Sequence, residues 1–416
     1  MFFDRRALGT LERHLGAARG VVLNGPRQSG KTELLRAAQR STGGSYVTLD
    51  DRTQLRAART DPTGFVAGRQ QPLFVDEVQR GGDPLVLALK VMLDGGGDPG
   101  QVVLAGSTRF LFEPRLSESL AGRVRFVDLW PMSQGEIEAG TDDLVDVLFE
   151  GPAAVRDRGA PRSPRADIAA RICRGGFPEA VLAPDARSRD DFLADYVRSL
   201  TQRDVLELAA IRQVVELPRL LRVLAARTAQ ELVPATVANE VDMGDDTTRR
   251  YLPLLEVVYA YHRVPAWSGN RRARAVRRPK LHLTDAGVAA HLLGVGPAAL
   301  ADPAHPLTGP LLETFVAGEV ARQLTWSETR AELFHWRVRS GPEVDLVLEA
   351  ADGRVVGIEV KAAASVHERD LRWLAQLRDD LGDRFVQGVV LACTDQVVPF
   401  GDRLTVVPVS ALWSGR

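Results

Sequence analysis

Short apolar runs alternate with amphipathic segments along the first third of the chain. Residues 21–23 and 73–75 are apolar and stand between polar or glycine-containing segments, so they predict buried strands. Residues 101–110 contain a third such run, and an amphipathic helix is expected after the first. Strands that alternate with helices are typical of an α/β domain with a parallel sheet. The pattern predicts an α/β core within residues 1–150.

The pattern changes after this core. Residues 151–166 are rich in Pro, Gly, Ala and Arg and have no apolar periodicity, which predicts an exposed loop. Helical periodicity then extends from 189 to 229. We interpret residues 151–230 as a linker followed by a helical region.

A different arrangement is predicted for residues 231–300. Two short helices are expected at 233–241 and 246–258, separated by a turn that contains Gly244. An apolar segment and a return strand at 280–285 follow them. Helix, turn, helix and hairpin in this order predict a winged helix.

The last part of the chain, residues 301–416, predicts a second α/β domain. An amphipathic helix at 311–324 is followed by candidate strands and one helix, at 333–338, 343–349, 354–362, 366–381 and 385–392. The hairpin allows a register argument. If Ala350 pairs with Arg354 across a three-residue loop, with Gly353 left-handed, then Asp345 lies opposite Glu359. A two-residue Asp-Gly turn would instead place these carboxylates on opposite faces.

Composition narrows the class of protein. A chain of 416 residues is too long for one ordinary core, and 45% hydrophobic with 26% charged residues is typical of globular proteins. The net charge of −1 means that a nucleic acid would have to be bound by a local patch. Two distant cysteines, Cys173 and Cys393, indicate a reducing compartment. Because no apolar run reaches about 18 residues, we expect a cytoplasmic protein without a membrane partner.

The segment GPRQSGKTEL, residues 25–34, predicts a nucleotide site. Gly25, Gly30, Lys31 and Thr32 fill the pattern G-x-x-x-x-G-K-[ST] between a predicted strand and a predicted helix. Backbone N–H groups of such a loop bind phosphate oxygens, the lysine reaches the β- and γ-phosphates, and the threonine hydroxyl binds Mg²⁺. ATP and Mg²⁺ are therefore the expected cofactors. The residues expected to contact them are Gly25, Pro26, Arg27, Gln28, Ser29, Gly30, Lys31, Thr32, Glu33, Asp76 and Ser107.

Asp76 and Glu77 follow the second predicted strand and supply the other half of such a site. We expect Asp76 to hold Mg²⁺ and Glu77 to orient the attacking water, which favours hydrolysis over transfer to a bound acceptor. The alternative is a carboxylate pair on a surface turn. Ser107 ends the third strand and is suited to sense the γ-phosphate. Arg123 is suited to complete the site of a neighbouring subunit, or is a solvated surface arginine.

Basic residues gather in two places of the predicted winged helix. The second helix presents Thr247, Arg249 and Arg250 from its first turn, and residues 270–280 hold six cations. These are Arg271, Arg272, Arg274, Arg277, Arg278 and Lys280. Such a cluster in a nearly neutral protein predicts phosphate contacts and a DNA partner. The alternatives are a solvated charge run, or a contact with the acidic surface of the ATPase.

The C-terminal hairpin carries a second group of candidate chemistry. Asp345 and Glu359 are hard ligands suited to Mg²⁺, and Lys361 could activate a water. The pattern Asp345…Glu359-Val360-Lys361 resembles the active-site motif of the PD-(D/E)xK nucleases, and Glu313 sits where that fold often adds an acidic residue. The resemblance implies a restriction-endonuclease-like domain that cuts DNA. Alternatively, the domain keeps the fold as a DNA-binding platform, or the hairpin bears solvated charges.

Across most of its length, the chain resembles bacterial and archaeal AAA-type ATPases. The segments that carry this likeness are GPRQSGKT, LFVDEVQ, LAGSTRFL, SLAGRV, LWPMS and GGFPEAVL. GGFPE is similar to the turn of a helical lid that closes over nucleotide, so the helical region of 151–230 would be a lid. One departure is that the AAA sensor position is more often Asn than Ser107. The resemblance implies an ATP-hydrolysing homo-oligomer, such as a hexamer, that acts on DNA in repair, recombination or defence. The alternatives are a ring-forming motor on DNA junctions with a silent nuclease-like domain, and a signalling switch that recruits proteins.

Overall fold

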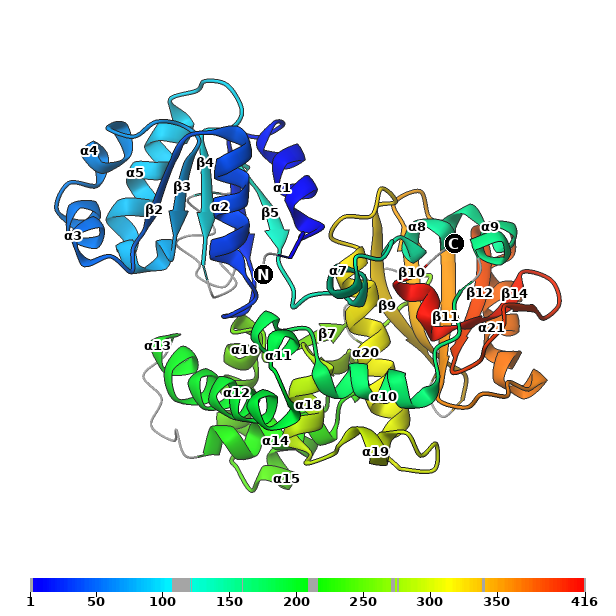
Figure 1. Ribbon diagram of the computed structural model, residues 1–416. Coiled ribbons are helices and arrows are strands. Elements are labelled where there is room, and N and C mark those ends of the chain that lie inside the picture. Colours follow the sequence, from blue (N-terminus) through cyan, green and yellow to red (C-terminus); the bar gives the residue numbers. More distant parts are fainter. Residues whose placement is uncertain are drawn as a thin grey trace. The chain divides into compact units, whose positions relative to one another are not determined.

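The structure is a computed structural model. It describes residues 3–106, 120, 122–158, 160–208, 216–270, 274, 277–338 and 341–414. The chain divides into two compact units (Figure 1). The first consists of Met1–Pro131 with Val257–Tyr259, and the second of Met132–Glu256 with Ala260–Arg416. The main segment of the first unit ends at Pro131, whereas the hydrophobic pattern predicted an α/β core that extends to residue 150.

The first unit is built on a five-stranded sheet in the order β2-β3-β4-β1-β5, and all its pairs are parallel. Its strands are β1 (Gly20–Asn24), β2 (Ser45–Thr48), β3 (Leu73–Asp76), β4 (Val102–Ala105) and β5 (Val124–Asp128). Helices α1 (Ala7–Leu15), α2 (Lys31–Thr42), α3 (Arg52–Thr60), α4 (Pro62–Ala67) and α5 (Gly82–Asp94) accompany it. The predicted parallel α/β core is confirmed.

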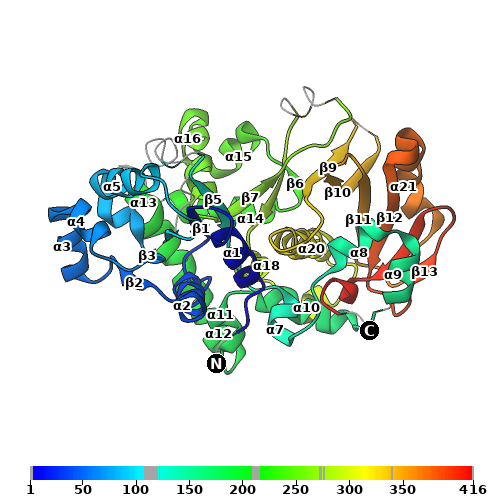
Figure 2. The same ribbon diagram turned by 90° about the horizontal axis from the view of Figure 1, so that it is seen from above.

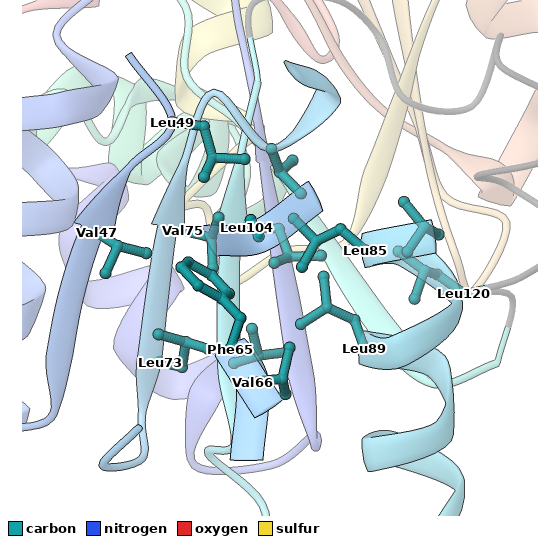
Figure 3. Packing of buried hydrophobic residues seen from close by; sticks show 14 of the residues in the cluster. Val47, Leu49, Phe65, Val66, Leu73, Val75, Leu85, Leu89, Leu104 and Leu120 are labelled. Atoms are coloured by element: carbon teal, nitrogen blue, oxygen red, sulfur yellow. The ribbon is translucent and has the colours of Figure 1, made fainter. Parts of the chain in front are cut away.

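Apolar side chains bury both faces of this sheet. One cluster joins Phe65, Val75, Leu89 and Leu104 (Figure 3). A second cluster joins α1 and α2 to the other face. Continuous apolar strands are what a doubly covered parallel sheet requires. Since β4 lies between β1 and β3, the carboxyl ends of these three strands meet at one edge, and the glycine loop and Asp76 follow two of them.

Helices dominate the beginning of the second unit. They are α7 (Gln134–Glu138), α8 (Leu144–Glu150), α9 (Pro152–Arg158), α10 (Arg165–Arg174), α11 (Pro178–Leu182), α12 (Ala186–Ser199), the π-helical turn η3 (Leu200–Asp204), α13 (Val205–Leu208) and α14 (Leu217–Ala226). Helix α9 lies in the segment predicted to be an exposed loop. Its Val155 is buried and Arg158 forms an ion pair with Asp143, and these contacts stabilise a helix that the composition did not indicate.

A small antiparallel sheet follows in the order β6-β8-β7. Its strands are β6 (Gln230–Glu231), β7 (Tyr261–Val264) and β8 (Lys280–Leu283), and helices α15 (Pro234–Val241) and α16 (Asp245–Val257) stand between β6 and β7 in the chain. Val237, Val241 and Tyr251 bury the inner faces of the two helices. The predicted helix pair and return strand are confirmed.

The second α/β layer is a six-stranded mixed sheet in the order β13-β14-β12-β11-β10-β9 (Figure 2). Its strands are β9 (Ala331–Arg337), β10 (Glu343–Ala350), β11 (Val355–Lys361), β12 (Phe385–Ala392), β13 (Val398–Pro399) and β14 (Leu404–Pro408). Helices α18 (Ala286–Leu292), α19 (Pro297–Leu300) and α20 (Thr308–Gln323) precede it, and α21 (Glu368–Leu381) joins β11 to β12. Leu374 of α21 packs on Gly357, where a Cβ would come within 2.7 Å. Among the helices that the structure describes, none is both long and apolar enough to cross a membrane.

Candidate functional site

The loop between β1 and α2 has the backbone geometry of a phosphate cradle. Gly25 and Gly30 adopt φ values of 156° and 95°, and Gln28 is left-handed at 62°. A Cβ on Gly25 would lie 2.3 Å from the carbonyl oxygen of Leu129, so only glycine fits there. The loop leads directly into the N-terminus of α2, where unpaired backbone N–H groups favour anions. The local sequence thus builds a site for phosphate.

Lys31 is buried at the start of α2. Its ammonium donates hydrogen bonds to the carbonyl oxygens of Gly25, at 2.9 Å, and Pro26, at 2.6 Å. These acceptors belong to the loop itself, so the ammonium lies where the loop would hold phosphate oxygens. These two carbonyl acceptors are neutral, and a more negative oxygen would compete well with them for the same donor.

Asp76 ends β3 and is almost completely buried. Its Oδ2 accepts hydrogen bonds from the hydroxyl of Thr32, at 2.6 Å, and from that of Tyr46, at 3.1 Å. Its Oδ1 accepts from the backbone N–H of Glu77 at 3.1 Å. Burial, together with the charge of Asp76, raises the pKa of Tyr46 to about 12. Thr32 and Asp76 place two hard oxygen ligands together, and these residues fit a magnesium ion.

Glu77 follows β3 in a left-handed conformation, with φ of 53°. The side-chain amide of Gln79 donates a hydrogen bond to its Oε2 at 2.5 Å. A non-glycine residue held in this region is typical of functional sites, because tertiary contacts must offset its strain. The carboxylate is therefore restrained at the same sheet edge as the glycine loop.

Two residues that sequence reasoning did not select also support this site. Tyr46 comes from β2, the neighbour of β3, and only the strand order brings it to Asp76. Arg5, near the start of the chain, donates to the carbonyl oxygens of Ser29, at 2.5 Å, and Trp130, at 2.7 Å. No local motif marks either residue.

The remaining predicted nucleotide contacts have different environments. Ser29 is buried and its hydroxyl donates to the carbonyl oxygen of Pro26 at 3.0 Å, so it shapes the loop. Arg27 is half-buried and Glu33 is exposed. Ser107 lies outside the described residues.

Arg123 lies at the opposite edge of the sheet. It precedes β5, which runs parallel to β1, while the glycine loop follows the carboxyl end of β1. Its guanidinium forms an ion pair with Asp94, and the hydrogen bond to Asp94 raises the pKa of Arg123. A role at its own glycine loop is thus geometrically remote. A role at the site of a neighbouring subunit stays a prediction.

The C-terminal hairpin has the three-residue loop, the first of the two turns that the sequence allows. The N–H of Ala350 donates to the carbonyl oxygen of Arg354 at 2.9 Å, and Gly353 is left-handed with φ of 88°. The ladder pairs Leu346 with Ile358. The ladder ends at this pair, and Asp345 and Glu359 are the next residues on the two strands. The three-residue loop is therefore confirmed, and the two carboxylates lie close enough for the charge of Asp345 to raise the pKa of Glu359.

Lys361 and Glu359 form a pair at the end of β11. The Lys361 ammonium donates to Glu359 Oε1 at 2.7 Å, and Asp345 Oδ2 accepts the backbone N–H of Val360 at 2.9 Å. Burial, and then the charge of Asp345, raise the pKa of Glu359 to about 8. Glu359 is thus held in a region that disfavours its negative charge.

Lys280 changes the interpretation of these acidic residues. Its ammonium lies 2.7 Å from Glu313 Oε1, 2.8 Å from Glu343 Oε1 and 3.3 Å from Asp345 Oδ1. The side chain is 1% exposed. Burial opposes its charge, but the three carboxylates outweigh burial and raise the pKa of Lys280. The prediction that Lys280 contacts DNA is wrong for this arrangement, because the lysine lies inside the protein.

The acidic cluster, defined as Glu313, Glu343, Asp345 and Glu359, does not fit Mg²⁺ as it stands. Its oxygens face the ammonium groups of Lys280 and Lys361 and the Val360 N–H. In the part of the chain that the structure describes, no group of three or more His, Cys, Asp and Glu residues is arranged to hold a metal ion. The ammonium groups of Lys280 and Lys361 therefore place two positive charges among these carboxylates. Among the residues that the structure describes, the buried Oε2 of Glu359 has no hydrogen-bond partner.

Arg274 also contacts the C-terminal sheet. It forms an ion pair with Glu349 of β10, and its guanidinium lies over the rings of Trp267 and Phe334. The predicted inter-domain alternative named the ATPase as the partner, whereas the observed partner is β10. Arg277 and Arg278 are exposed. Arg271 and Arg272 lie outside the described residues.

The first turn of α16 holds the other predicted DNA contacts. Arg249 and Arg250 are exposed, whereas Thr247 is half-buried. Arg249 pairs with Asp245 at 2.7 Å, and Arg250 lies over the ring of Tyr251. Asp245 and Asp246 occupy the same turn, so its surface carries both signs of charge.

The GGFPE segment packs within the second unit. The N–H of Gly176 donates to Asp285 Oδ2 at 2.7 Å, and its carbonyl oxygen accepts the N–H of Met132 at 2.7 Å. A Cβ on Gly176 would lie 2.3 Å from the Met132 carbonyl oxygen. This close approach explains the glycine and joins GGFPE to the LWPMS segment. A lid role is not needed to explain it.

The sheet order, the glycine loop and the Thr32–Asp76 pair define a P-loop protein of the AAA ATPase class, and residues 18–138 match the family model described as an AAA domain. Residues 165–299 and 308–412 match two domains of unknown function, DUF8612 and DUF4143. The chain belongs to the family of the uncharacterized protein Rv2008c of Mycobacterium tuberculosis. The two are 30% identical over 370 residues, which cover 88% of this chain and 75% of the relative. Mb2031c of Mycobacterium bovis matches with the same values.

Solved structures show weaker likeness. The Walker-type ATPase PABY2304 of Pyrococcus abyssi is 15% identical with a TM-score of 0.42, covering 70% of this chain and 96% of that one. The Holliday junction branch migration motor RuvB of Thermotoga maritima is 18% identical with a TM-score of 0.31, covering 64% and 91%. Neither score establishes a common overall arrangement, so neither structure informs the function of this chain.

Proposed function

We propose that the protein is a Mg²⁺-dependent ATPase that acts on DNA without cutting it. The observation that carries the ATPase part is the 2.6 Å hydrogen bond between the Thr32 hydroxyl and Asp76 beside the glycine loop. Two of the side chains that a P-loop hydrolase uses are thereby already in contact. The AAA domain match to residues 18–138 supports the same class.

In this proposal each side chain has a definite task. Loop N–H groups and Lys31 bind the phosphates, and Thr32 and Asp76 hold magnesium. The magnesium ion, when bound, neutralises charge on the β- and γ-phosphates. Glu77 orients the attacking water, and its bond to Gln79 keeps the carboxylate restrained until substrate arrives. Arg123 would serve a neighbouring subunit, which implies a homo-oligomer such as a hexamer.

The DNA part rests on the middle of the chain. Helix α14, β6, α15, α16, β7 and β8 follow the chain order of a winged helix, and Arg249, Arg250, Arg277 and Arg278 are exposed on it. Exposed arginines contact phosphates, and their release of counterions makes binding fall with salt. A nuclease-like but silent C-terminal domain is favoured by Lys280, which fills the acidic cluster.

Phosphate release in the presence of single-stranded, duplex, forked and four-way DNA tests the proposal. We expect hydrolysis that DNA stimulates, and stimulation that disappears in high salt. Lys31→Met serves as the control without hydrolysis. Hydrolysis that no DNA changes would leave the ATPase intact and refute the DNA part.

A protein-recruiting signalling switch is the rival function. The mixed charge of the first turn of α16, with Asp245 and Asp246 beside the arginines, favours it over non-specific DNA binding. Arg249→Glu with Arg250→Glu distinguishes the two. Loss of DNA stimulation with unchanged basal hydrolysis supports DNA, whereas unchanged DNA binding supports the switch.

A further inference from the structure

Lys280 is a charged residue whose side chain is buried inside the protein. It begins β8 of the small sheet, yet its ammonium contacts Glu313 of α20 and Glu343 and Asp345 of β10. One side chain of the middle region thus reaches three carboxylates of the C-terminal region. All of these residues belong to the same compact unit.

The hydrogen-bonding capacity of the ammonium matches this environment. A lysine ammonium has three donors, and Glu313, Glu343 and Asp345 supply three acceptors. An unpaired buried charge would be strongly unfavourable, and so would several carboxylates packed together without a cation. The buried ammonium and the buried carboxylates therefore stabilise each other's charge. The ammonium provides the positive charge that a metal ion would otherwise bring.

A divalent cation and this ammonium exclude each other. Mg²⁺ demands oxygen ligands at short distance and near-octahedral geometry, whereas these oxygens already point at Nζ. Two positive centres within a few ångströms in a buried site would repel strongly. The second oxygen of Asp345 is engaged by the Val360 N–H, and Oε1 of Glu359 by Lys361. The buried Oε2 of Glu359 has no hydrogen-bond partner among the described residues.

We propose that Lys280 is the resident cation of the acidic cluster. Its ammonium stands in the place of a divalent metal ion and fastens β8 to the C-terminal sheet. The carboxylates have the composition of a metal site, and the Lys280 ammonium occupies the position that the metal would need. The cluster is accordingly a metal-free ion-pair network that links β8 to α20 and β10. Replacement of Lys280 by a neutral side chain of similar length should allow the carboxylates to bind a cation.

Binding of Mn²⁺ to the full-length, nucleotide-free protein tests this directly, with electron paramagnetic resonance counting bound ions. Every variant carries Asp76→Asn, so that the P-loop contributes no metal. We expect that Lys280→Met gains about one Mn²⁺ per chain relative to its parent. Adding Asp345→Asn to Lys280→Met should remove that ion again.

Arg274→Met is the matched control. It also removes a cation that the middle region places against β10, but Arg274 contacts Glu349 outside the acidic cluster. We expect no added Mn²⁺. A folded Lys280→Met protein without an added ion would overturn the proposal. If Lys280→Met does not fold, the Asp76→Asn parent is compared with the same protein that also carries Asp345→Asn. Mn²⁺ binding that the parent shows and that Asp345→Asn abolishes would overturn the proposal. Equal Mn²⁺ binding by these two proteins would support it.

Discussion

Lys31 and Lys280 are both buried lysines, but their ammonium groups meet different partners. Lys31 donates to the neutral carbonyl oxygens of Gly25 and Pro26, whereas Lys280 contacts three carboxylates. A phosphate oxygen outcompetes a carbonyl for an ammonium, since charge-assisted hydrogen bonds are the stronger ones. It gains much less over carboxylates that are already in place. The contacts to the loop carbonyls thus suit Lys31 to phosphate binding, and the contacts to three carboxylates suit Lys280 to a structural role.

The largest expected effect is on stability at the acidic cluster. Lys280→Ala leaves buried carboxylates without their cation, which should lower the free energy of unfolding by about 3–5 kcal/mol. Urea unfolding of the full chain measures it. Arg249→Ala is the control, because the Arg249–Asp245 pair is exposed and should contribute at most about 1 kcal/mol. Equal effects of the two substitutions would contradict a buried role for Lys280.

Lys31 should behave in the opposite manner. Lys31→Met removes a donor aimed at developing phosphate charge, and we expect kcat for ATP hydrolysis to fall by about 10³-fold. Its unfolding free energy should change little compared with Lys280→Ala. Steady-state phosphate release, with chemical denaturation in parallel, checks both. Normal turnover by Lys31→Met would remove the P-loop from the mechanism.

Glu77→Gln sharpens the assignment within the nucleotide site. The amide keeps the size of the side chain but cannot attract a proton from water, so kcat should fall by about 10²-fold. ATP affinity should stay within a few-fold, because phosphate binding does not need this carboxylate. Equilibrium binding of a fluorescent ATP analogue separates the two. A parallel loss of affinity would indicate a binding role for Glu77 instead.

Tyr46→Phe tests a contact from a neighbouring strand. Removing one hydrogen bond to Asp76 costs about 1 kcal/mol, which corresponds to roughly a fivefold change. We expect the Mg²⁺ concentration for half-maximal hydrolysis to rise by about this factor, with kcat nearly unchanged. Titration of hydrolysis with Mg²⁺ measures it. An unchanged titration would show that Thr32 and the Glu77 N–H orient Asp76 without Tyr46.

The pH dependence of stability should reveal Glu359. Its pKa rises from 4.5 to about 8 on folding, so the native state binds more protons than the unfolded state within that range. The free energy of unfolding should therefore fall as pH rises from about 4.5 to about 8. Glu359→Gln should make that profile flatter. A profile that the substitution leaves unchanged would refute the shift.

The sequence predicted the features that depend on neighbours along the chain. The glycine loop and the three-residue hairpin at Ala350–Arg354 are set by local turn chemistry. The glycine loop was predicted, and the three-residue hairpin was one of the two turns that the sequence allowed, whereas the metal site expected from it was not found among the described residues. The strand that ends at Asp76 was found because a doubly covered parallel strand is continuously apolar.

The features that depend on tertiary contacts were missed. Lys280 stands at the end of a run of arginines, and nothing in that run distinguishes the one side chain that becomes buried. Its partner Glu313 lies 33 residues further along the chain. Tyr46 reaches Asp76 only through the order of strands in the sheet. Val155 stabilises a helix where Pro, Gly and Arg dominate the composition.

One reaction tests the central claim, that the P-loop performs chemistry and the acidic cluster does not. Full-length protein is incubated with ATP, Mg²⁺ and end-labelled forked and four-way DNA, and phosphate release and DNA length are followed together. We predict continuing phosphate release with DNA that stays intact, and no release from Lys31→Met. Mg²⁺-dependent cleavage that disappears in Asp345→Asn would contradict the account.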